Sequence, residues 1–190
     1  MILPIVAYGH PTLKKVAVDI EAGYPNLAKL IEDMWETMYH ANGVGLAAPQ
    51  VNQSIRLFLV DATSYADEFE EAKDFKKVFI NAHITEMSGE EVVMNEGCLS
   101  IPGMSEEVAR RNTILIQYVD ENFERKSETY SGFIARVIQH EYDHIDGVLY
   151  VDRLTPFRKM LLKGKLRDIS EGKVDVDYRM IFPALRRKGR

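Results

Sequence analysis

The chain has 190 residues, of which 46% are hydrophobic and 28% charged, proportions that are ordinary for a globular protein with one sizeable core. Its formal net charge of -5 argues against a general nucleic-acid-binding protein, and no apolar run approaches the roughly 18 residues of a membrane-spanning helix. Residues 1–4 lack the basic and long apolar segments of a secretory signal, so we expect a cytoplasmic protein, and the single cysteine excludes an internal disulfide.

Helical spacing of apolar residues predicts a first helix over residues 26–41. The segment that follows, residues 43–50, contains too many small residues for a good helix or strand. Runs of apolar and β-branched residues then predict three strands, over residues 55–60, 78–84 and 91–94. Between the first two strands, the charged residues 67–77 indicate a loop or a short helix.

The next part of the chain predicts a hairpin followed by a helix. Apolar and polar residues alternate over residues 108–120 and 124–130, which is typical of two antiparallel strands. Ser131 can cap a second long helix over residues 132–146, and Gly147 can end it.

A third helix, with basic residues along one side, is predicted over residues 156–170. Most strands precede the 132–146 helix and no regular β-α-β alternation occurs, so we expect an α+β fold. In this fold, antiparallel or mixed sheets would pack around the 132–146 helix. We expect residues 1–190 to form one catalytic domain, with the segment from about residue 156 least defined. The basic tail, residues 185–190, is interpreted as a solvated terminus.

The strongest chemical signal is an HExxH sequence, residues 140–144, inside the second predicted helix. Residues four apart lie one turn apart on the same face, so both imidazoles could bind one metal ion. Glu141 follows the first histidine and could act on a water molecule at that ion. Apolar residues at core spacing flank the sequence, which favours an inward-facing site over a charged surface. Three other histidines show no ligand spacing: His10, His40 and His83.

A catalytic site of this type usually has a third protein ligand. The extended HExxHxxGxxH pattern is excluded because residue 150 is tyrosine. Thermolysin-like zinc peptidases use a downstream glutamate, a part that Glu171 could play. Cys98 is the other candidate, because it lies beside a glycine near a proline, and a thiolate binds such an ion more strongly than a carboxylate. Sequence spacing does not choose between them.

Three segments taken together resemble the signature motifs of peptide deformylases, in the family's order: residues 43–50 (GVGLAAPQ), 96–100 (EGCLS) and 139–144 (QHEYDH). The resemblance covers roughly residues 1–155. It implies a metallo-amidohydrolase that removes the N-formyl group from N-formylmethionyl nascent polypeptides and releases formate. A thermolysin-like zinc peptidase and a noncatalytic metal- or peptide-binding relative are the alternatives.

The resemblance assigns the metal ligands to Cys98, His140 and His144. The family is known for one divalent ion, Fe(II) natively, and for working with Zn(II) or Ni(II) in its place. A hydroxide formed from water at that ion would attack the formyl carbon.

The same resemblance gives the catalytic groups. Glu141 would act as base and then acid, while the Gln50 side-chain amide and the Leu99 backbone N–H would stabilise the oxyanion. The methionine pocket of the family corresponds to four apolar residues of this chain: Val44, Met94, Phe133 and Val137. Gly45 would let the substrate backbone approach. Glu96 and Arg110 are predicted to form an ion pair that holds the Cys98 loop.

Two positions depart from the family pattern. Ser105 stands where some members have a substrate-binding arginine, and Arg136 stands where some have an apolar pocket residue. These differences bear on how this chain would hold its peptide. The basic helix and tail could contact the ribosome transiently, because the substrate emerges there.

Overall fold

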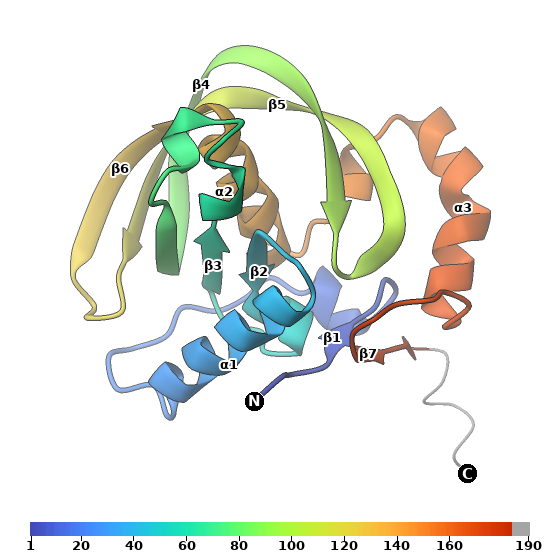
Figure 1. The fold of residues 1–190 in the computed structure, drawn as a ribbon, viewed down its shortest axis with the longest axis horizontal. Helices are drawn as coiled ribbons and strands as arrows, with labels where there is room; N and C mark the ends of the chain where they lie inside the picture. Colours follow the sequence, from blue (N-terminus) through green and yellow to red (C-terminus); the bar gives the residue numbers. More distant parts are fainter. Residues whose placement is uncertain (184–190) are drawn as a thin grey trace.

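We describe the protein from a computed structural model over residues 1–183, in which the larger of two sheets has five antiparallel strands (Figure 1). The strand order is β2-β3-β4-β5-β6. The strands are β2 (Gly45–Ala47), β3 (Leu57–Asp61), β4 (Lys76–Cys98), β5 (Ile101–Val119) and β6 (Arg125–Ser131). The expected α+β class is confirmed, and the predicted basic tail, residues 185–190, lies outside the described residues.

The predicted strands over 78–84 and 91–94 are parts of one strand, β4, so their separation was wrong. Residues between them are largely exposed and polar, which hides the strand from a search for apolar alternation, yet their backbone still pairs with β5. The pairing register shifts at three places along this stretch, and Asn81 and Gly89 adopt positive φ at two of them. Such bulges bend a strand, and Figure 1 shows β4 and β5 arching together over the molecule.

Two further strand predictions need correction. β5 begins at Ile101, seven residues before the predicted hairpin strand at 108, and therefore follows β4 almost directly. The small-residue segment over 43–50 contains β2 and most of a 3₁₀ turn, Ala48–Val51. β2 is fully buried, and small side chains suit a strand that is covered on both faces.

The three predicted helices are present as α1 (Leu27–His40), α2 (Gly132–Ile145) and α3 (Pro156–Ser170). Short 3₁₀ segments occur over Pro11–Lys14, Ala48–Val51, Thr63–Tyr65, Glu70–Ala72 and Tyr150–Arg153. Ser131 occupies the N-cap position of α2, but its side chain makes no capping bond. Asn112 Oδ1 accepts from the Gly132 N–H at 3.0 Å and Glu71 Oε1 from the Phe133 N–H at 3.1 Å, so residues distant in sequence replace the predicted cap.

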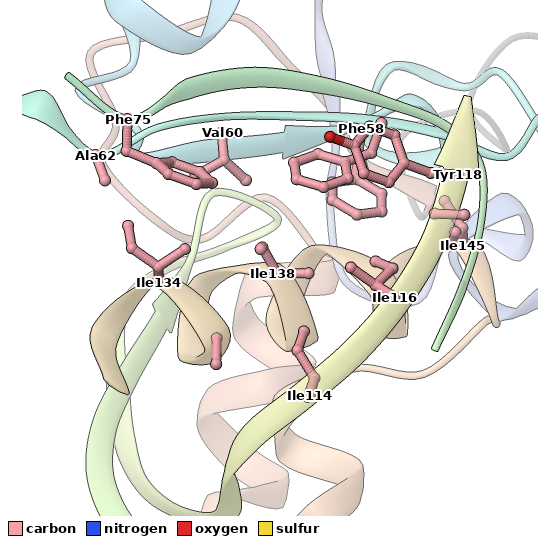
Figure 2. Packing of buried hydrophobic residues seen from close by; sticks show 14 of the residues in the cluster. Phe58, Val60, Ala62, Phe75, Ile114, Ile116, Tyr118, Ile134, Ile138 and Ile145 are labelled. Carbon is pink, nitrogen blue, oxygen red and sulfur yellow. The ribbon is translucent and has the colours of Figure 1, made fainter. Parts of the chain in front are cut away.

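The apolar side of α2 packs against the concave face of the sheet (Figure 2). Ile134 and Ile138 lie among strand residues that include Phe58 and Ile116, and the rings of Phe58 and Phe79 stack at 4.7 Å. Burying one such side chain contributes about 1.5–3 kcal/mol. This packing fixes the rotation of α2, so that its histidines turn away from the apolar core.

The two ends of the described chain meet in a separate two-stranded sheet. β1 (Ile5–Val6) pairs in parallel with β7 (Met180–Ile181). The segment after α3 therefore returns towards the start of the chain, as Figure 1 shows near the N-terminus. Within residues 1–183, no helix combines the length and the apolar character that crossing a bilayer requires.

Candidate metal centre

Cys98, His140 and His144 form one cluster of ligand atoms. Cys98 ends β4, and the two histidines lie one turn apart on α2. Their ligand atoms all lie within 4.8 Å of one another, with Cys98 Sγ 3.3 Å from His144 Nε2. One thiolate and two imidazoles are a donor set that first-row divalent ions accept, so these residues fit a metal ion.

The two imidazoles lie in different surroundings: His144 is buried, whereas His140 is partly exposed. His140 Nδ1 lies 2.9 Å from Glu96 Oε2, which leaves Nε2 as its ligand atom. A carboxylate behind a ligating histidine fixes the ring and its tautomer. Burial lowers the pKa of His144 well below its usual value, and the neutral imidazole that results is the form that binds metals. His144 Nδ1 has no hydrogen-bond partner within residues 1–183.

Glu96 is held by two buried arginines. Arg110 donates to its carboxylate from Nε at 2.6 Å and from Nη2 at 2.8 Å, and Arg136 donates from Nη1 at 2.8 Å. Burial alone would raise the pKa of Glu96, but hydrogen bonds from Arg110 and His140 outweigh it and hold that pKa well below its usual range. The predicted Glu96–Arg110 pair is therefore present, and it is buried.

The Arg136 side chain, one of the two departures from the family pattern, completes this cluster. Besides Glu96, its Nη1 donates to the Val108 carbonyl at 2.8 Å and its Nη2 donates to the Val92 carbonyl. The guanidinium thus ties α2 to both strands of the long hairpin, and it is 6% exposed. Ser105, the other departure, is exposed on β5 opposite Gly97.

Asp143 adds an ion pair that the sequence analysis missed. It lies inside the HExxH sequence and accepts from Arg110 Nη1 at 2.8 Å and from Arg153 Nε at 2.6 Å. A buried acidic residue needs cationic partners, so the position of Asp143 between the two histidines of a helix expected to face inward could have predicted this ion pair. Arg110 consequently bridges Glu96 and Asp143.

Glu141 is buried beside the cluster with 4% exposure, and burial raises its pKa to about 7. Its Oε2 has no hydrogen-bond partner among the described residues. The residue lies in the wall of a cleft. Gly45 makes room for this carboxylate, because a Cβ at that position would lie 2.5 Å from Glu141 Oε1. A glycine there is required by the close approach of α2 to β2.

Gln50 directs its amide towards Cys98. Its Oε1 accepts from the Ala47 N–H at 2.8 Å, which fixes the orientation of the amide group. Its Nε2 consequently lies 3.5 Å from Cys98 Sγ and 3.4 Å from Ser100 Oγ. Leu99 lies in the turn between β4 and β5 and lines the same cleft.

The cleft beside this cluster has a volume of about 580 Å³. Four of the predicted substrate-binding residues line it: Val44, Gly45, Phe133 and Val137. The wall also includes Arg136 and residues that were not predicted, among them Tyr65, Asp175 and Tyr178. Met94 and Ser105 are not among the described residues of the wall. Tyr65 packs against Phe133 with ring centroids 5.0 Å apart, a contact between distant segments that sequence periodicity cannot reveal.

The structure places Glu171 at the C-cap of α3, where its carboxylate pairs with Lys173. Among the described residues, it does not belong to the ligand cluster. The histidines without ligand spacing also lie outside the cluster: His10 accepts from the Thr12 N–H at 3.3 Å, and His83 lies 3.6 Å from Asp19. His40 lines the cleft at a distance from the ligand atoms.

In protein stripped of divalent metal, we expect Glu141→Gln to remove a pH-dependent cost of folding. The folded protein keeps a proton on Glu141 that the unfolded chain releases above about pH 4.5. As the pH rises from this value through about 7, the free energy of unfolding of the unmodified protein should therefore fall relative to that of the glutamine variant. The full loss is on the order of 3 kcal/mol. Urea unfolding of both proteins at pH 5 and pH 8 measures this, and a pH-independent difference would contradict it.

Comparison with known proteins agrees with the geometry. A sequence model of the family described as polypeptide deformylase matches residues 2–160. The chain is 55% identical to peptide deformylase of Christiangramia forsetii, over 96% of this chain and 97% of that protein. It is 52% identical to peptide deformylase of Flavobacterium johnsoniae over the whole of both chains.

Solved structures give the same result. Peptide deformylase from Thermotoga maritima matches with a TM-score of 0.74 and 40% identity, over 82% of this chain and 99% of that chain. The Plasmodium falciparum enzyme matches with a TM-score of 0.79 and 34% identity, over 88% of this chain and 95% of that chain. The chain therefore belongs to the polypeptide deformylase family.

Proposed function

We propose that this chain removes the N-formyl group from N-formylmethionyl nascent polypeptides and releases formate. The observation that carries the proposal is the cluster of Cys98, His140 and His144 beside the buried carboxylate of Glu141, at the wall of a cleft. Family membership narrows the reaction to deformylation. A cytoplasmic location belongs to the same proposal, because formylated chains are made there.

Cys98, His140 and His144 would hold one divalent ion, with Fe(II) expected and Zn(II) or Ni(II) as substitutes. When bound, the ion supplies Lewis acidity, which polarises the formyl carbonyl and makes water acidic enough to attack near neutral pH. Two observations support this ligand set: burial favours the neutral, ligating form of His144, and the contact with Glu96 orients the ring of His140. The reducing cytoplasm would protect the thiolate of Cys98 from oxidation.

Glu141 would take a proton from the attacking water and return it to the departing amine. Burial raises the pKa of Glu141 towards neutrality in the metal-free protein, which supports a role in proton transfer, because a group is most effective when its pKa lies near the working pH. Its Oε2 is unpaired among the described residues and is therefore available for that proton.

Gln50 and Leu99 would stabilise the oxyanion that develops at the formyl carbon. The Gln50 amide is held by the Ala47 N–H and its NH₂ lies beside Cys98, which supports Gln50 as a donor fixed before the reaction starts. The Leu99 backbone N–H is the second proposed donor. Donors fixed in advance need no reorganisation when charge appears.

The peptide would extend along the edge of the sheet beside Gly45, while the methionine side chain enters the cleft between Val44, Phe133 and Val137. Met94 was also predicted as a pocket residue, but it is not among the described residues that line the cleft, so its assignment has no support there. The formyl group is the smallest acyl group, so close packing around Glu141 would exclude larger ones.

Formate release from a formyl-Met-Ala peptide tests the catalytic assignments. Gln50→Leu is expected to lower kcat by about 10²–10³-fold, the usual effect of deleting one oxyanion donor. Glu141→Gln should retain metal while turnover collapses. Gln53→Leu removes an exposed glutamine three residues from Gln50 and serves as the matched control, with activity unchanged. Absence of formate release by the freshly reduced, iron-loaded protein would favour a noncatalytic relative.

Metal content after dialysis tests the ligand set. Cys98→Ser should lose the ion, because the strongest donor is replaced by a neutral hydroxyl. Glu171→Ala should keep it, because this carboxylate pairs with Lys173 instead. Loss of metal only in the Glu171 variant would reverse the assignment and support a thermolysin-like peptidase.

We further propose a transient ribosome contact through α3. This helix exposes Phe157, Met160 and Leu161 together with several basic side chains, a combination suited to an anionic partner with apolar patches. Lys163→Glu should weaken co-sedimentation with ribosomes at low salt, whereas Lys126→Glu near the β5–β6 turn should not. Equal binding by both variants and the unmodified protein would contradict the contact.

A further inference from the structure

The turn between β4 and β5 is held by both ends of the described chain. Tyr8, two residues after β1, donates its backbone N–H to the Ser100 carbonyl at 2.8 Å. Tyr178, two residues before β7, donates its hydroxyl to the Leu99 carbonyl at 2.8 Å. Because β1 and β7 pair with each other, these two contacts reach the turn from segments that are themselves hydrogen-bonded together.

The peptide group between Leu99 and Ser100 links Tyr178 to the metal centre. Its oxygen accepts from the Tyr178 hydroxyl, and its nitrogen, the Ser100 N–H, donates to Cys98 Sγ at 3.4 Å. A peptide group is planar and rigid, so a partner that fixes the oxygen also fixes the direction of the N–H. The chain of contacts therefore runs from the C-terminal segment to the sulfur of Cys98.

We infer that Tyr178 is a positioning residue of the metal centre, which holds the Leu99–Ser100 peptide so that the Ser100 N–H points at the thiolate of Cys98. The inference rests on the proposed function, because it takes Cys98 as a metal ligand.

The expected effect is on the electron density of the sulfur. A hydrogen bond to a ligating thiolate withdraws charge from it, and such bonds tune the properties of metal–sulfur sites. A hydrogen bond to the peptide oxygen polarises the group and strengthens the N–H at its other end. Tyr178 would therefore keep the thiolate less basic, and it would steady the turn that also carries the Leu99 N–H.

The surroundings of Tyr178 suit this role. The side chain is half-buried against the apolar cluster that includes Met38 and Leu46, and it lines the cleft. Burial raises the pKa of Tyr178 to about 12, so the hydroxyl remains a donor across the working range. The residue lies beyond the match to the family model, which ends at residue 160, so the motifs do not predict it.

The test compares Tyr178→Phe with unmodified protein, both loaded with Co(II). The variant deletes one hydroxyl and keeps the ring. We expect the sulfur-to-cobalt charge-transfer band to move to longer wavelength, because a more electron-rich thiolate gives up charge more easily. In the formate assay, kcat should fall about tenfold with KM little changed. Tyr24→Phe is the matched control, since Tyr24 packs against the same apolar cluster and its hydroxyl contacts neither Leu99 nor Ser100; both readouts should stay unchanged.

Each outcome decides the inference. An unchanged band and kcat in Tyr178→Phe, even with a lower melting temperature, would reduce Tyr178 to a structural contact and overturn it. Absence of the sulfur-to-cobalt band in the unmodified protein would remove Cys98 as a ligand and overturn it as well. A normal band without formate release would instead contradict the proposed function, while the band comparison would still decide the role of Tyr178.

Discussion

The carboxylate of Glu96 accepts hydrogen bonds from Arg110 and Arg136 and lies against His140, and this buried cluster joins the long β4–β5 hairpin to α2. Buried charges are costly to leave unpaired, by about 3–5 kcal/mol when one partner is lost, so the arrangement has little freedom to rearrange. Because Cys98 lies two residues beyond Glu96, the same cluster helps to position the sulfur of Cys98 relative to the two imidazoles.

The second constraint is the close approach of α2 to β2. Gly45 lets the carboxylate of Glu141 lie against the strand, where burial keeps its pKa near neutrality. The chemistry proposed for Glu141 thus depends on having a glycine, Gly45, on the neighbouring strand. Gln50 lies in the 3₁₀ turn that follows this strand. One short segment therefore provides both the space for Glu141, the proposed base, and the proposed oxyanion donor.

The sequence predicted the three helices well, because their apolar residues recur with helical period against a buried face. It divided β4 into two strands, because the exposed residues between them carry no alternation and only pairing with β5 reveals the strand. It also assigned the cap of α2 to Ser131, whereas Asn112 and Glu71 supply the acceptors. Propensity and periodicity are local, and these contacts join segments far apart in the chain.

The sequence by itself determined the identities of Cys98, His140 and His144 as candidate ligands, because helical spacing and three unusual motifs are written in consecutive residues. Spacing did not choose between Cys98 and Glu171; the resemblance to the family motifs assigned Cys98, and of these two residues Cys98 is the one that lies in the cluster of described ligand atoms. Only the tertiary structure brought Arg136 to Glu96 and the Tyr178 hydroxyl to the turn after Cys98. The physical reason is that a hydrogen bond between distant residues depends on how the intervening chain packs, and no local pattern records that packing.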